Sequence, residues 1–430
     1  MLRPTNPPTT STNRPIVIPL AKNRRVFPAA GHLADSCEVS LSAPLRARFA
    51  SPLRRSLPVI STAVRSWALL LLALGMWAAI CGNIAPAVEP AAAEVELLND
   101  VGDGQLQRFE FVDAALIAGG MTDLRSRAEM LRRRGEKYAA IDFTAIRKLP
   151  LAERATTVLS ALHQHLLTGT FRPTATLVQE TLTTGDFNCV TATVLFHDMC
   201  SRANVSVEII AQSGHVCSRL PNTSGLIETT RSNVVEAEAA TRQSRVIMPG
   251  ELLGRIYYNR ALAALEKRDF DSAQHLLQHS LICDPQDRDA QENLLAGLNN
   301  WALALCEQGD YAAAARRVAA GLALKADYQP LLSNDLHVHQ QWVAELCRAG
   351  EFPQALQVLE AGRARRPTAA LFAGGQRAVY EAWLRHCTEQ GDTAAAAQVL
   401  RRAQEQLGPR VKLRLEARPM RHGTHLAPPR

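Results

Sequence analysis

Three residues of this chain carry side chains that could cooperate in nucleophilic chemistry, namely Cys189, His215 and Glu228. A thiol is a strong nucleophile only as a thiolate, and a helix N-terminus or a neighbouring imidazole lowers its pKa from about 8.5. The imidazole can then act as general base and acid, while a carboxylate holds the ring in the required tautomer. The order of thiol, imidazole and carboxylate along the chain is therefore the strongest indication of chemistry in this sequence.

The thiol is predicted to lie in the first turn of a helix. Residues 185–188 (GDFN) have turn chemistry, and residues 189–202 carry apolar side chains in helical rhythm at positions 190, 194, 195, 196 and 199. The unpaired amide groups and the positive dipole end of such a helix favour a thiolate at Cys189.

The imidazole and the carboxylate are predicted to lie on neighbouring antiparallel strands. Residues 205–210 are rich in β-branched side chains, and residues 215–220 and 226–230 are predicted to form two further strands separated by turn residues. His215 would begin the second of these strands and Glu228 would lie on the third, close enough to orient the imidazole ring.

At these motifs the chain resembles the transglutaminase-like thiol superfamily, which has a papain-like core. The matching motifs are Asn188-Cys189-Val190-Thr191-Ala192, Gly214-His215-Val216 and Ile227-Glu228-Thr229-Thr230, within residues 147–230. The resemblance implies Cys189 as nucleophile, His215 as base and Glu228 as the third member, with the Cys189 backbone amide as one oxyanion donor. The chain departs from the family pattern at two places. Glu228 stands where Asp is usual, and Val216-Cys217 follows the histidine where the family commonly has an aromatic residue.

The sequence also allows other interpretations of the cysteine and histidine residues. Cys217 lies two residues from His215, and therefore on the same strand face, so it could be the reactive thiol or merely pack. Cys200 follows Cys189 on one helix face and is predicted to lie in the core. A zinc site from Cys189, His197, Cys200, His215 and Cys217 can be drawn, but no paired metal-ligand spacing supports it. We expect neither a metal nor a cofactor.

The basic charge of the chain is concentrated at its N-terminus. The 430 residues have a net charge of +7, whereas residues 1–65 alone hold ten Lys or Arg against two acidic residues. The rest of the chain is therefore close to neutral, which argues against nucleic acid as a partner. Residues 1–65 are rich in Pro, Ser, Thr and Arg and are predicted to be a disordered leader.

An apolar segment follows this leader. Residues 66–88 are long enough for a transmembrane helix and also have the parts of a signal peptide. Basic residues precede the segment, which predicts a membrane anchor with the body outside the cytoplasm, periplasmic or extracellular, or a secreted protein if the segment is cleaved. Seven cysteines follow it without paired spacing, so no disulfide framework is implied.

The C-terminal half carries an internal repeat with a period of 41 residues. Aromatic residues, glycines and alanines recur in this register, at Phe270, Tyr311 and Phe352, with Thr393 continuing it, at Trp301, Trp342 and Trp383, at Gly309, Gly350 and Gly391, and at Ala273, Ala314, Ala355 and Ala396. The pattern resembles tetratricopeptide repeats lengthened by two helical turns, and such repeats are expected to bind partner proteins.

The sequence as a whole predicts an α+β papain- or transglutaminase-like domain followed by an all-α solenoid, with an N-terminal transmembrane or signal helix. We place the first domain at residues 100–235, about four repeats at 251–408 and a disordered tail at 409–430. The predicted function is acyl transfer or amide hydrolysis on a peptide or protein substrate. The alternative is a catalytically inactive peptide-binding or scaffold protein that acts through its repeats.

Overall fold

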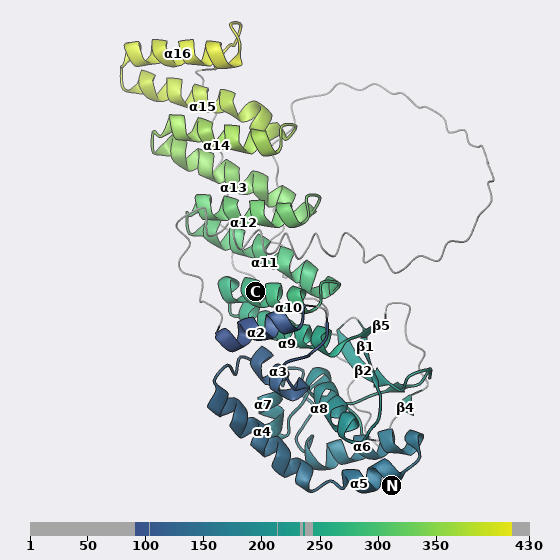
Figure 1. The fold of residues 1–430 in the computed structure, drawn as a ribbon. Coiled ribbons are helices and arrows are strands. Elements are labelled where there is room, and N and C mark those ends of the chain that lie inside the picture. Colours follow the sequence, from purple (N-terminus) through teal and green to yellow (C-terminus); the bar gives the residue numbers. More distant parts are fainter. Residues whose placement is uncertain (1–90, 103, 213, 233–234, 237–243, 415–430) are drawn as a thin grey trace, which may run out of the picture. The chain divides into compact units, whose positions relative to one another are not determined.

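The computed structural model describes residues 91–102, 104–212, 214–232, 235–236 and 244–414, which form two compact units that divide after Ala296 (Figure 1). The predicted leader 1–65 and apolar segment 66–88 lie outside the described residues, as does most of the predicted tail. None of the described helices combines the length and the apolar character that crossing a membrane requires.

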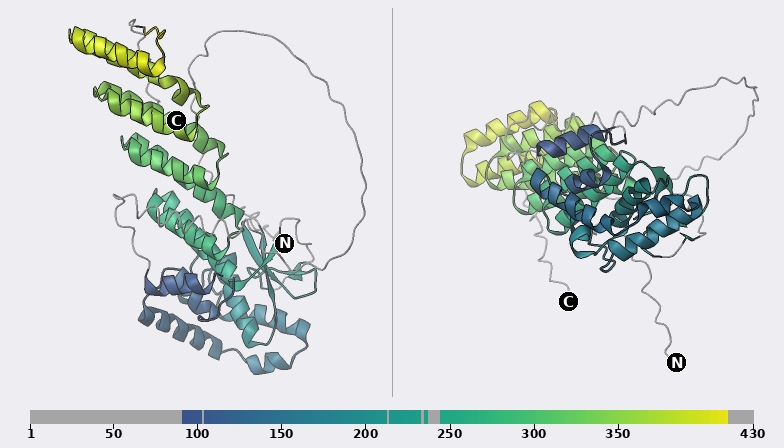
Figure 2. Two further views of the ribbon diagram at one scale, coloured as in Figure 1. Left: turned by 45° about the horizontal axis from the view of Figure 1, so that its top comes forward. Right: turned by 60° about the horizontal axis from the view of Figure 1, so that its bottom comes forward.

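Within the residues that the structure describes, seven helices of unit 1 precede its sheet, and Figure 2 shows them in two further views. Their bounds are α2 (Ala92–Asp100), α3 (Phe111–Ala118), α4 (Leu124–Ala139), α5 (Phe143–Lys148), α6 (Leu151–His165), α7 (Val178–Thr184) and α8 (Cys189–Arg202). The helix α8 is the centre of this group, since Ala192, Leu195, Phe196 and Met199 are fully buried in the main core.

The sheet of unit 1 is small and antiparallel, with the strand order β4-β3-β2-β1-β5. Its strands are β1 (Glu208–Gln212), β2 (His215–Arg219), β3 (Leu226–Ile227), β4 (Val235–Glu236) and β5 (Arg245–Ile247). One face of the sheet joins the main core through residues such as Val216 and Ile227. Strand β2 packs directly against α8, which sets the distance between the thiol and the imidazole.

The prediction of an α+β papain-like domain is wrong. Most of the described residues are helical, and the strands are only two to five residues long. The physical reason lies in the composition of the core. The helices supply most of the buried side chains, and the sheet adds only a few apolar residues. The third predicted strand, 226–230, also ends early, so that Glu228 follows β3 instead of lying on it.

Two further helices complete the core of unit 1, namely α9 (Pro249–Glu266) and α10 (Phe270–Cys283). Helix α9 contacts both α3 and α8, and its Leu252, Leu253, Ile256 and Tyr257 are fully buried with them. Helix α11 (Arg288–Glu307) then runs across the division between the units.

Unit 2 continues with helices that each pack against the next one along the chain. They are α12 (Tyr311–Leu324), α13 (Gln329–Arg348), α14 (Phe352–Arg365), α15 (Ala370–Glu389) and α16 (Thr393–Leu407). Helix starts recur at the 41-residue spacing of the sequence, and Asp310 and Asp392 cap two of these starts by accepting from Ala313 and Ala395 amides. Gly321 and Gly362, also one period apart, leave room for Leu331 and Phe372 of the following helices.

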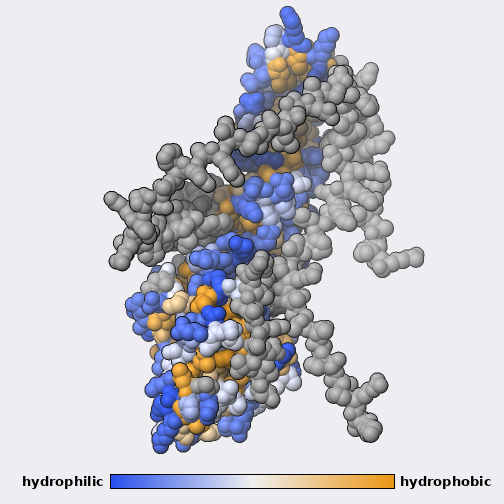
Figure 3. Space-filling view, turned by 90° about the vertical axis from the view of Figure 1, so that its right-hand side faces the viewer, coloured by the Kyte–Doolittle hydropathy of each residue, from blue (hydrophilic) through white to orange (hydrophobic). Residues whose placement is uncertain are grey.

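The surface of unit 1 mixes apolar and hydrophilic side chains on the face that Figure 3 presents. The exposed large apolar side chains of the described residues in unit 1 are Val95, Leu124, Leu151, Phe171, Val246 and Met248. One of them, Phe171, lies beside the chain segment that leads into Cys189.

Candidate active site

The structure places Cys189 at the first position of α8, under a complete N-terminal cap. Asn188 Oδ1 accepts hydrogen bonds from the amides of Val190 and Thr191 at 2.9 and 3.0 Å, and Thr191 Oγ1 accepts from the Asn188 amide at 3.0 Å. This reciprocal capping box holds the first turn rigidly and leaves the positive end of the helix dipole at the thiol. The predicted helix 189–202 is confirmed in its bounds.

The Cys189 amide is also well placed to donate to a developing oxyanion. In the part of the chain that the structure describes, no hydrogen bond occupies this amide. First-turn amides have no intrahelical acceptor, so the amide remains ready for an oxygen close to the thiol.

His215 reaches this thiol from the start of β2, where it pairs with Gln212 of β1. Its Nε2 donates to Glu228 Oε2 at 2.7 Å, which leaves Nδ1 for the Cys189 thiol. Burial alone would lower the pKa of His215, but hydrogen bonding to Cys189 and Glu228 outweighs it and raises that pKa to about 10. The His215 ring therefore carries a proton at neutral pH.

Glu228 uses both of its carboxylate oxygens. Oε2 accepts from His215, while Oε1 accepts from the Thr230 hydroxyl at 2.7 Å and from the Thr230 amide at 3.2 Å. Burial would raise the pKa of Glu228, yet the bonds to His215 and Thr230 lower it, so the carboxylate stays charged. Thr230 thus holds the Glu228 carboxylate in place from both its hydroxyl and its amide.

A second set of polar residues braces this trio, and the sequence reasoning did not identify it. The buried hydroxyls of Thr193 on α8 and Thr229 lie 2.9 Å apart. His163 Nε2 on α6 bonds the Thr229 carbonyl at 3.0 Å, and its ring meets the Phe187 ring edge-on. Burial lowers the pKa of His163, so its neutral ring donates that bond. No spacing in the sequence could have signalled a brace that joins three separate elements.

The neighbouring cysteines lie in different surroundings. Cys217 is 2% exposed, and burial raises the pKa of its thiol to about 12. Cys200 is fully buried, and burial raises its thiol pKa even further. Both thiols are therefore protonated at neutral pH, whereas Cys189 is only partly buried. Within the described ranges, no group of three or more His, Cys, Asp or Glu side chains is arranged to hold a metal ion.

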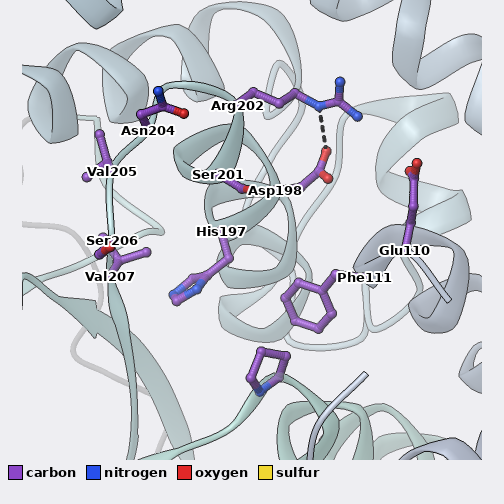
Figure 4. Close-up of a pocket in the computed structure, with 11 residues that line it drawn as sticks. Glu110, Phe111, His197, Asp198, Ser201, Arg202, Asn204, Val205, Ser206 and Val207 are labelled. Atoms are coloured by element: carbon purple, nitrogen blue, oxygen red, sulfur yellow. Dashed lines mark hydrogen bonds and ion pairs between the residues drawn. The ribbon is translucent and has the colours of Figure 1, made fainter. Parts of the chain in front are cut away.

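A separate pocket of about 800 Å³ lies at the other end of α8 (Figure 4). His197, Asp198 and Arg202 of α8 line it, together with Glu110 and Phe111. Asp198 accepts from the Arg202 guanidinium, and burial lowers the pKa of His197 to about 3. None of Cys189, His215 and Glu228 lines this pocket, so it is not part of the same site.

A comparison with protein-family models, curated proteins and solved structures finds no match for this chain. The function of the protein is therefore inferred from the geometry of the trio and of the residues that hold it.

Proposed function

We propose that this protein is a thiol-dependent acyl-transfer or amide-hydrolysing enzyme with Cys189 as its nucleophile. The observation that carries the proposal is a single juxtaposition. A partly exposed thiol under a helix cap shares His215 with the charged carboxylate of Glu228. Buried structural cysteines and histidines do not require such an arrangement.

The residues would act in the following order. The Cys189 thiolate attacks the carbonyl carbon of an amide or ester, and the Cys189 amide donates to the resulting oxyanion. His215 gives its proton to the leaving nitrogen or oxygen as the bond to the carbonyl carbon breaks. A water or amine then attacks the thioester, His215 takes its proton, and the acyl group leaves Cys189. Glu228 keeps Nδ1 of the ring directed at the thiol throughout.

The substrate class that we propose is a peptide or protein, with water as the default acceptor. In the same proposal, the helical repeats contribute protein binding, while the acyl chemistry needs no cofactor. The competing possibility is an inactive protein in which the trio is only structural.

Thiol alkylation distinguishes these possibilities. In the full chain at pH 6, iodoacetamide is expected to modify Cys189 about tenfold faster than any of the six cysteines that follow it in the chain, because only thiolates react appreciably. Peptide mass spectrometry of the alkylated protein measures each site separately. His215→Ala should remove this advantage, and Cys217→Ser, the matched control, should leave it intact. Equal slow modification of Cys189 and of the six cysteines that follow it would favour the inactive protein.

A further inference from the structure

A short extended segment runs beside the residues that lead into Cys189. Phe171 and Phe187 form a parallel β-bridge, in which the Phe187 amide donates to the Thr170 carbonyl at 3.2 Å and the Arg172 amide donates to the Phe187 carbonyl at 2.9 Å. Asn188 Nδ2 adds a bond to the Pro173 carbonyl at 3.4 Å. Residues 170–173 are therefore attached to the residues immediately before the nucleophile.

The outer edge of this segment has a free donor and a free acceptor. In a parallel bridge of this register, the bonds use the amide and carbonyl of Phe187, so those of Phe171 point to the opposite side. Among the residues that the structure describes, no hydrogen bond uses the Phe171 amide or carbonyl. Such an edge can pair with the main chain of another extended peptide.

The side chain of Phe171 adds an apolar surface at the same place. It is 51% exposed, although its ring lies edge-on to the buried Phe187 ring with centroids 6.1 Å apart. Phe187 in turn contacts His163, which bonds the carbonyl next to Glu228. The exposed ring of Phe171 is thus connected through the Phe187 ring to the residues that support the trio.

We propose that Phe171 is the specificity-determining residue of the site. Its amide and carbonyl pair with the main chain of an extended peptide, and its ring contacts an apolar side chain of that peptide. Cys189 follows Phe187 by two positions, which is roughly 7 Å of extended chain. The apolar side chain would therefore lie about two residues from the bond that Cys189 attacks. This inference rests on the proposed thiol chemistry and narrows its substrate to an extended peptide with an apolar side chain near the bond that is attacked.

Binding can be measured without the chemistry by using the full chain with Cys189→Ala. The probes are two fluorescein-labelled, end-blocked tetrapeptides that differ only in a leucine or an aspartate at the second residue, with fluorescence anisotropy as the readout. The leucine peptide is expected to bind more tightly than the aspartate peptide. Adding Phe171→Ala should weaken binding of the leucine peptide about tenfold, as the loss of an apolar contact in a recognition site does, while Phe171→Leu should retain most of the affinity.

Two controls test whether the loss of peptide affinity is specific to Phe171 and to its main-chain pairing. Leu124→Ala removes another exposed apolar side chain, 72% exposed at the start of α4, and should leave peptide binding unchanged. Methylating the main-chain nitrogen of the leucine should weaken binding, because it removes the donor for the Phe171 carbonyl.

The outcomes also separate this inference from the proposed function. Equal affinities of the two peptides, or no effect of Phe171→Ala, would overturn the inference even if iodoacetamide modifies Cys189 rapidly. Slow modification of Cys189 together with Phe171-dependent peptide binding would instead overturn the catalytic proposal. Phe171 would then remain a peptide-binding residue.

Discussion

At the scale of single residues, the site depends on how His215 is charged. Its side chain is 33% exposed, so solvent competes with its partners, yet hydrogen bonding to Cys189 and Glu228 raises its pKa well above the ordinary value of 6.5. The lowered pKa of Glu228 is the other side of the same interaction. The two residues therefore titrate as a coupled pair and not independently.

The first prediction concerns pH. Because the folded-state pKa of His215 is raised to about 10, its contribution to stability is fully present below about pH 6.5 and is lost as the pH rises toward 10. The difference in free energy of unfolding between wild type and His215→Gln should shrink over that range. Denaturant titrations at a series of pH values measure it, and a constant difference would contradict the charged pair. In nuclear magnetic resonance titrations, Glu228→Gln should lower the pKa of His215.

At the scale of elements, the site is assembled where α8 begins and where the chain leaves β3. The capping box of Asn188 and Thr191 fixes the first of these points. The hydroxyl pair of Thr193 and Thr229 joins the second point to α8. A single substitution can remove either the capping box or the hydroxyl pair.

The second prediction removes the helix cap. Asn188→Ala should cost about 1 kcal/mol of stability, as N-cap removal typically does, and should also slow alkylation of Cys189 because the first turn loosens. Asp123→Ala is the matched control, since Asp123 caps α4 by accepting from the Ser126 amide at 2.7 Å. It should cost a similar free energy and leave the alkylation rate unchanged. Equal effects of both variants on that rate would indicate a global loss of stability instead.

The third prediction removes the buried hydroxyl pair. Thr193→Val leaves the Thr229 hydroxyl buried without its Thr193 partner, which should cost about 1–3 kcal/mol. Thr181 is equally buried, but its hydroxyl has no hydrogen-bond partner within the described part of the chain. Thr181→Val should therefore be close to neutral. Chemical denaturation of the two variants provides the comparison, and similar costs for both would argue that the Thr193 bond contributes little.

At the scale of the whole molecule, α9 belongs to the core that supports the site, although every residue of the trio and its brace precedes it. Leu252, Leu253, Ile256 and Tyr257 of α9 are fully buried with α3 and α8. Burying one large apolar side chain contributes about 1.5–3 kcal/mol. Four of them together approach the whole stability of an ordinary domain.

The fourth prediction follows from this packing. A chain that ends after Met248 should unfold and lose the selective alkylation of Cys189, because the core loses α9. A chain that ends after Glu307, which retains all of α11, should keep both the fold of unit 1 and the alkylation rate. Circular dichroism and the alkylation assay test both truncations. Selective alkylation in the shorter chain would mean that α9 is dispensable.

Local sequence patterns were sufficient for the parts of the structure that depend on near neighbours. The bounds of α8 follow from the Asn188 cap and from the apolar rhythm after it, and helices begin at Phe270, Tyr311 and Phe352 as their common spacing suggests. Capping and amphipathic periodicity act within a few residues, so they can be read directly from the chain.

Only the tertiary structure decided how much of the core is helical and which residues support the trio. The sheet proved too small for the predicted α+β fold, because apolar faces of distant helices fill the space beside α8. Thr230, Thr193, Thr229 and His163 were not identified, since a hydroxyl or a ring gains its role from a partner that folding brings near. Sequence order alone determined the candidates Cys189, His215 and Glu228. Three-dimensional packing determined that the His215 ring lies 2.7 Å from the Glu228 carboxylate, because two side chains 13 residues apart come within hydrogen-bond distance only through the fold.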